Sequence, residues 1–290
     1  MSQYSMPLKI IECPRDAMQG LKEFIPTAIK ANYINLLLKA GFDTLDFGSF
    51  VSPKAIPQMR DTAEVLSRLE LENNPTKLLA IVANSRGAED AATFPEIDYL
   101  GYPFSISETF QLRNTNATIQ ESLDRVKQIQ DICVQSNKEL VIYISMGFGN
   151  PYGDPWNAEI VKTWVEQLQA LDIRIFQLSD TIGVATPQSI RYIFSELIGA
   201  YPALEFGAHF HTVPALWHEK IDAAYKSGCR RFDGAIKGYG GCPMAKDDLT
   251  GNMPTENMIA YFHEAEDLTG INLEILLRAL AKAQEVFPAH

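Results

Sequence analysis

Short apolar runs alternate with longer amphipathic stretches along most of the chain. An apolar run of roughly four to eight residues is typical of a buried strand, whereas apolar residues at helical spacing predict a helix. Residues 140–145 (LVIYIS) give the clearest strand, and the longest helix is expected over 118–135. Glycine ends helices, and a hydroxyl residue followed by proline begins them, so Gly41 and Thr186-Pro187 mark boundaries. The expected strands are 8–12, 44–49, 78–83, 97–102, 140–145, 173–178, 204–211 and 231–235, and the expected helices are 24–40, 61–71, a short one near 88, 118–135, 158–171, 186–200, 215–227, 255–268 and 273–286.

This alternation makes about eight strand–helix units of roughly 30 residues each. Strands that alternate with helices pair in parallel through crossover connections. Such units, with no linker or low-complexity segment between them, favour an α/β fold: a closed (β/α)8 TIM barrel with closing C-terminal helices, in a single catalytic domain over 1–290. The alternative is a doubly wound open sheet, but the sequence has no P-loop and no GxGxxG after the first strand. In a barrel, the chemistry is expected at the carboxyl ends of the strands.

Composition narrows the class of protein. The 290 residues include 25 Lys+Arg and 36 Asp+Glu, which gives a formal charge of −11. This balance argues against nucleic-acid binding, which needs a basic face. No apolar stretch reaches the roughly 18 residues of a membrane span, so we expect no membrane partner. The four cysteines form no CxxC motif and the N-terminus lacks the pattern of a signal peptide, so we expect a cytoplasmic protein with reduced thiols.

Two histidines on one expected strand are the first candidates for chemistry. His209 and His211 are two residues apart, so their side chains point to the same face of the strand. In a barrel that face is the interior, where two imidazoles suit a divalent metal; two hydrogen-bonded structural histidines are the alternative. Asp16 follows the first strand and Asn252 follows the eighth, and they add oxygen ligands. Mixed nitrogen and oxygen ligands suit Mg²⁺ or Mn²⁺.

Other polar residues also lie at or near strand ends. Asp180 follows the sixth expected strand and Asp46 lies in the second. A buried carboxylate is costly unless it is paired, so each is either functional or part of a structural salt bridge. The glycine-rich segment 237–252 carries Cys242 and is a candidate lid that brings a proton donor to the substrate; a surface thiol on a glycine turn is the alternative. Candidate phosphate partners, each equally consistent with a solvated surface charge, are Lys54, Arg113 and Lys246.

Over roughly residues 8 to 285 the chain resembles the 3-hydroxy-3-methylglutaryl-CoA lyase family, a group of divalent-metal-dependent barrels related to Claisen-condensing enzymes. The specific segments are SFVSPK within 49–59 and GGCP within 238–243. The other motifs are PRDAMQ (14–19), SDTIGV (179–184), HFH (209–211) and GNMPTE (251–256). The resemblance implies metal ligands at Asp16, His209, His211 and Asn252, a catalytic Arg15, a loop Cys242, supporting acids at Asp46, Asp180 and Glu256, and substrate-lining residues at Gln19 and Asn84.

Four positions depart from the family pattern. Ala17 replaces a usual glycine, so that turn must accommodate a side chain. Asp46 stands where relatives carry glutamate, and Thr212 stands where they carry an acidic residue or asparagine. Lys220 replaces an asparagine. The ligands are intact but their neighbours are changed, and such neighbours tune metal affinity.

The resemblance implies a retro-Claisen cleavage of 3-hydroxy-3-methylglutaryl-CoA, or a close 3-hydroxyacyl-CoA, to acetyl-CoA and acetoacetate, with Mg²⁺ or Mn²⁺ and in a homodimer. Asp16 or His209 would act as the base, Arg15 would stabilise the enolate, and Cys242 would protonate it. A condensing enzyme is the first alternative, although such enzymes usually carry further C-terminal domains. A metal hydrolase commonly has its HxH on the first strand, not the seventh. A non-catalytic metal-binding protein is the remaining alternative.

Overall fold

The computed structural model describes residues 6–241, 250–268 and 270–287. Parallel strands follow one another around a closed barrel, because β1 pairs with β8 and β6 with β7. This closure confirms the expected barrel and excludes the open sheet. The barrel strands are β1 (Lys9–Glu12), β2 (Thr44–Ser49), β3 (Lys77–Ile81), β4 (Tyr99–Ser105), β5 (Glu139–Ser145), β6 (Ile175–Asp180), β7 (Glu205–Thr212) and β8 (Arg231–Gly234).

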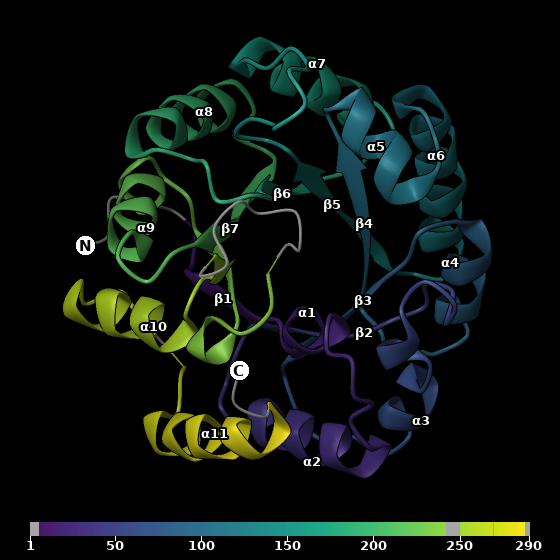
Figure 1. The fold of residues 1–290 in the computed structure, drawn as a ribbon, viewed down its shortest axis with the longest axis vertical. Helices are drawn as coiled ribbons and strands as arrows, with labels where there is room; N and C mark the ends of the chain where they lie inside the picture. Colours follow the sequence, from purple (N-terminus) through teal and green to yellow (C-terminus); the bar gives the residue numbers. More distant parts are fainter. Residues whose placement is uncertain (1–5, 242–249, 269, 288–290) are drawn as a thin grey trace.

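Helices form a ring around the strands (Figure 1). The last helix, α11, packs beside α2 and closes the ring near the C-terminal end of the described chain (Figure 1). Within the described residues, no helix is long and apolar enough to cross a membrane. The helices are α1 (Pro14–Gln19), α2 (Thr27–Leu38), α3 (Thr62–Leu66), α4 (Ser85–Ala92), α5 (Glu108–Thr115), α6 (Ile119–Gln135), α7 (Ala158–Gln169), α8 (Pro187–Ala200), α9 (Trp217–Lys226), α10 (Thr255–Glu264) and α11 (Leu273–Val286), with 3₁₀ turns η1 (Pro57–Met59) and η2 (Ile236–Gly238).

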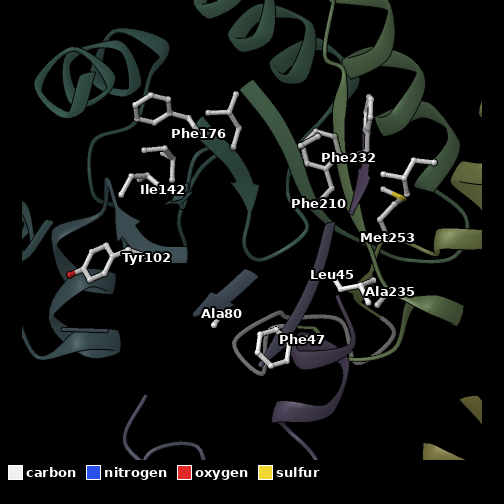
Figure 2. Packing of buried hydrophobic residues seen from close by; sticks show 14 of the residues in the cluster. Leu45, Phe47, Ala80, Tyr102, Ile142, Phe176, Phe210, Phe232, Ala235 and Met253 are labelled. Carbon is white, nitrogen blue, oxygen red and sulfur yellow. The ribbon is translucent and has the colours of Figure 1, made fainter. Parts of the chain in front are cut away.

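The two faces of the barrel wall carry different side chains, because successive residues of a strand point to opposite sides. The outward face supplies the large apolar cluster between strands and helices, to which Phe176, Phe210 and Phe232 belong (Figure 2). A second, smaller cluster comes from the alternate positions and fills the barrel interior. Its members are Leu79, Ile81, Tyr99, Val141, Tyr143 and Ile175. Toward the mouth, the interior also carries polar residues, among them Ser145, Ser179 and His209.

Some elements differ from the sequence-based expectation. Residues 14–19 form the short helix α1, where only a segment after the first strand was expected. Helix α5 was not expected at all, and α3 covers only Thr62–Leu66 of the expected 61–71. Gly251–Asn252 forms a short strand, β9, antiparallel to β7. These elements are too short for a hydrophobic period to be visible, since a period needs about 11 residues or more.

Candidate active site

A cavity of about 400 Å³ opens at the carboxyl ends of the strands. This size suits the reacting part of a small-molecule substrate, since ligand sites span roughly 300–1,000 Å³. The lining combines polar and apolar side chains, which suits a substrate with a charged and a hydrocarbon part. The polar lining residues include Arg15, Asp16, Gln19, Ser145, Ser179, Thr181, His209 and His211, and the apolar ones include Val51, Ala55, Ile56, Ile81, Ala83, Pro103 and Phe110.

The expected metal ligands come together at the cavity floor. Ligand atoms of Asp16, His209 and His211 all lie within 4.8 Å of one another. Asn252 of β9 pairs in register with His211, and its amide nitrogen donates to the Tyr239 carbonyl at 2.8 Å, which leaves the amide oxygen available as a ligand. Asp16 Oδ2 and His211 Nε2 are buried without a hydrogen-bond partner among the described residues. Orphaned carboxylate and imidazole atoms in one cluster fit a divalent cation.

Each histidine ring is oriented by a hydrogen bond at Nδ1. His209 Nδ1 lies 3.0 Å from Asp233 Oδ2, and His211 Nδ1 lies 2.8 Å from the Thr181 carbonyl oxygen. Such partners fix the orientation of each ring, so that its Nε2 would be free to hold a metal. Burial, and then the charge of His209, lowers the pKa of His211, which favours the neutral imidazole that a metal needs. Burial also acts to lower the pKa of His209, but the hydrogen bond and charge of Asp233 outweigh it and raise this pKa.

Arg15 is held between two carboxylates. Its Nε donates to both oxygens of Asp46 at 3.1 Å, and its Nη1 donates to Asp16 Oδ1 at 3.0 Å. Gln19 Nε2 donates to the same Asp16 oxygen at 2.6 Å, so Asp16 keeps only Oδ2 for a metal. Burial alone raises the pKa of Asp16, but Arg15 and the histidines lower it to about 2. Burial raises the pKa of Asp46 to about 6 despite the opposing charge of Arg15.

Asp180 lies behind the cavity wall. It has the same parity as the outward-facing residues of β6, whereas Ser179 faces the cavity. Its Oδ2 accepts from Lys220 Nζ at 2.7 Å, and the same ammonium group donates to the carbonyl oxygens of His211 and Gly183. The structural salt bridge considered for Asp180 therefore exists. Its partner is a lysine that sequence reasoning had noted only as a departure from the family.

Other predicted site residues lie farther from the cavity. Asn84 caps α4 by accepting from the Gly87 amide, and Glu256 accepts from the Lys237 amide at 2.9 Å. Neither is among the described residues that line the cavity. Of the candidate phosphate partners, Arg113 packs its guanidinium over the ring of Tyr152. Lys54 is exposed, and Cys242 and Lys246 lie outside the described residues.

Of the expected lid, the structure describes residues 237–241 and 250–252, whereas 242–249 lie outside the described residues. Gly241 lines the cavity, and Cys242 follows it in the chain. Gly240 has φ +82°, and a Cβ there would lie 2.7 Å from the Asp16 carbonyl oxygen, so only glycine fits this approach to α1. Ala17 is an ordinary helical residue of α1, not part of a turn. Its methyl group therefore requires no unusual backbone conformation.

Sequence reasoning missed three groups of functional interest. Asp233, the partner of His209, lies on the expected strand 231–235. A carboxylate on a buried strand is a sequence signal of a functional or paired residue. The Thr181 carbonyl that orients His211 had no sequence signal, because it is a backbone group. Helix α5 contributes Phe110 and two neighbours to the cavity, and its Ser107 N-cap was a usable sign. The other two lining residues of α5 are Asn114 and Thr115.

Known proteins resemble this chain over nearly its full length. The family model described as HMGL-like matches residues 8–285. A hydroxymethylglutaryl-CoA lyase of Bacillus subtilis is 33% identical over 272 residues, which cover 94% of this chain and 90% of that protein. The crystal structure of a Bacillus subtilis HMG-CoA lyase has a TM-score of 0.91 and 31% identity, and the match covers 100% of this chain and 98% of that one.

A structure of an HMG-CoA lyase from Acinetobacter baumannii, in complex with coenzyme A and 3-methylmalate, is also similar. Its TM-score is 0.89 at 30% identity, and the match covers 99% of this chain and 93% of that chain. The resemblance seen in the motifs is thus confirmed over nearly the full length. On the family model and these relatives together, the chain belongs to the HMGL-like family.

Proposed function

We propose that this protein is a metal-dependent carbon–carbon lyase that cleaves 3-hydroxy-3-methylglutaryl-CoA to acetyl-CoA and acetoacetate. The observation that carries the proposal is the placement of Arg15 directly beside Asp16, within one cavity that also holds both histidines. A fixed cation next to a metal-ligand cluster suits a retro-Claisen cleavage, because a bound metal would ease deprotonation of the hydroxyl group and the cation would stabilise the enolate. The names of the relatives, which are HMG-CoA lyases, support the same reaction.

The cation would be Mg²⁺ or Mn²⁺. Asp16 Oδ2, the Nε2 atoms of His209 and His211, and the side-chain oxygen of Asn252 would hold it. Two imidazoles with two oxygen donors are suited to such an ion when positions remain open for substrate. When bound, it supplies Lewis-acid chemistry, which makes the substrate hydroxyl easier to deprotonate.

Proton and charge transfer fall to the chain's own residues. Asp16 or His209 removes the proton of the tertiary hydroxyl group. The C2–C3 bond then breaks, its electron pair passes to the thioester to form the enolate of acetyl-CoA, and the hydroxyl carbon becomes the ketone of acetoacetate. Arg15 donates to the enolate oxygen from a position that Asp46 and Asp16 fix before the substrate arrives.

The last step returns a proton to the enolate carbon. We assign this proton to the thiol of Cys242 because Gly241, the residue before it, lines the cavity. Replacing the thiol by a hydroxyl group raises the acid's pKa far above that of a thiol, so Cys242→Ser should slow this step strongly. On the family resemblance we further propose a homodimer of single-domain chains over 1–290, and light scattering would test this oligomeric state. The lack of a CxxC motif and the existence of a cytoplasmic relative favour a cytoplasmic location.

The test is steady-state cleavage of the C2–C3 bond of 3-hydroxy-3-methylglutaryl-CoA by metal-loaded protein. Arg15→Met should lower kcat by about 10²–10³-fold or more, because removing an oxyanion donor has that effect. Arg68→Met is the matched control, since Arg68 pairs with Glu64 on the exposed surface of α3 and its neighbouring turn. Near-normal turnover by Arg15→Met would contradict the assigned role. Condensation of acetyl-CoA with a 2-oxo acid, without release of acetoacetate from 3-hydroxy-3-methylglutaryl-CoA, would overturn the lyase itself.

A further inference from the structure

A buried amide lies directly behind one of the metal-ligand histidines. Gln177 of β6 is completely buried, and its side chain faces the barrel interior. Its Nε2 donates to Asp233 Oδ1, while the other oxygen of Asp233 holds His209 Nδ1 at 3.0 Å. A continuous chain of hydrogen bonds therefore runs from the barrel interior to the metal-ligand cluster. Gln177 does not line the cavity, so it reaches the reaction only through Asp233.

The neighbouring strand is built to admit this side chain. Gln177 pairs in register with Gly207 of β7. A Cβ at Gly207 would lie 1.5 Å from Gln177 Oε1 and 2.6 Å from its Cδ. Any residue larger than glycine would therefore displace the amide. Gly207 does not have a positive φ, so substitution there acts by steric contact and not by backbone strain.

Asp233 needs both of its partners to keep one orientation. A carboxylate held at a single oxygen can rotate about its terminal torsion, which has a broad energy well. The amide at Oδ1 removes this freedom and leaves Oδ2 toward the imidazole. Partners of this kind, one step removed from the ligand, set ring orientation and basicity in metal sites.

We propose that Gln177, given room by Gly207, is a positioning residue that fixes Asp233 and thereby aims His209 Nε2 at the metal. This inference rests on the metal site of the proposed function. The alternative is that Gln177 only fills space inside the barrel. The two differ in what an isosteric apolar side chain does, because Gln177→Met keeps the volume but removes the donor.

The experiment measures Mn²⁺ affinity of the full-length protein by electron paramagnetic resonance of free Mn²⁺, alongside thermal unfolding. Gln177→Met should raise the Mn²⁺ dissociation constant about 10–100-fold, the effect typical of losing such a partner. Asn35→Leu is the matched control: it removes a buried amide that bonds the Arg68 carbonyl and the Glu70 amide, away from the barrel mouth. That variant should melt earlier and bind Mn²⁺ normally.

A double-mutant cycle tests the role of the glycine. Gly207→Ala should weaken Mn²⁺ binding in the natural background but cause no further loss in Gln177→Ala, which lacks the displaced amide. Unchanged affinity in folded Gln177→Met, or an equal effect of Gly207→Ala in both backgrounds, would overturn the inference and leave the proposed lyase intact. Absence of Mn²⁺ and Mg²⁺ binding by the natural protein would overturn the metal site and this inference together.

Discussion

Arg15 is fixed before any substrate binds, and this is the main property of the site at the scale of single residues. Asp46 accepts from Nε through both of its oxygens, and Asp16 accepts from Nη1. The side chain is almost fully buried, so it has few other positions available. Preorganised charge of this kind needs no rearrangement during the reaction. Asp46 thus reaches the guanidinium, although the family resemblance predicts a longer glutamate at this position.

Asp46→Asn should separate orientation from charge at Arg15. The amide cannot accept two hydrogen bonds from the guanidinium in the same way, so we expect kcat to fall about 100-fold, as for a misplaced catalytic group, with little change in KM. Steady-state kinetics on the acyl-CoA substrate would measure both. A large rise in KM at constant kcat would show instead that Asp46 serves substrate binding.

The buried ion pair between Lys220 and Asp180 leads to a prediction about stability. Removing one partner of a buried ion pair leaves the other uncompensated, so Lys220→Met should reduce the free energy of unfolding by about 3–5 kcal/mol. Lys226→Met is the control, because Lys226 pairs with Asp222 on the exposed face of α9 and should cost about 1 kcal/mol or less. Denaturant titration measures both. Equal losses in the two variants would contradict the structural role of the Lys220–Asp180 pair.

At the scale of elements, short connections hold the mouth of the barrel. Asp154, in the segment before α7, accepts from Ser107 Oγ and from both the amide and hydroxyl of Thr109 at 2.9 Å. These hydrogen bonds fix the position of the first residues of α5, a helix that lines the cavity. Glu12 similarly joins the end of β1 to η2 and α10, because it accepts from the Ile236 amide and from Thr255 Oγ1.

Loss of the α5 anchor should affect substrate binding. Asp154→Ala removes three hydrogen bonds at the start of α5, so we expect a several-fold rise in KM for the acyl-CoA with kcat nearly unchanged. The site of chemistry on β7 and α1 is not touched by this substitution. Steady-state kinetics checks the split. A fall in kcat at constant KM would contradict the assignment of α5 to substrate binding.

Glu12 should make stability depend on pH. Burial raises its pKa from the ordinary 4.5 to about 8, so between these values the folded state binds more protons than the unfolded state. The contribution to stability is full below pH 4.5 and is lost as the pH rises through 8, by at most about 1.4 kcal/mol per pH unit. Denaturant titrations from pH 5 to 9 should show a steeper decline for the natural protein than for Glu12→Gln. Parallel curves would contradict this.

At the scale of the whole molecule, the barrel could be predicted because the apolar residues of each long strand or helix follow the spacing typical of that element. The capped helix at Thr186-Pro187 and the strand at 44–49 appear where expected. The helix α1, by contrast, depends on tertiary packing against the barrel mouth, since it has only six residues and five of them are buried, including the charged Arg15 and Asp16. Propensity in so short a segment carries little information.

The candidate site was predictable in part for the same reason. His209 and His211 follow from strand parity, and the same parity places Asp180 behind the wall, which could have been read from the alternation with Ser179. Contacts between segments far apart in the chain could not be predicted from the sequence. Asp233 and Gln177 lie close to His209 because β7 pairs with both β6 and β8 in a fixed register. That register becomes known only once the barrel has formed.

The most direct test of the account is to quantify acetyl-CoA and acetoacetate released from 3-hydroxy-3-methylglutaryl-CoA by the purified protein. The measurement is made with Mg²⁺ or Mn²⁺, after chelation, and after the metal is restored. We predict the two products in equal amounts, loss of turnover on chelation, and recovery when the metal returns. Folded, metal-loaded protein that releases neither product would contradict it.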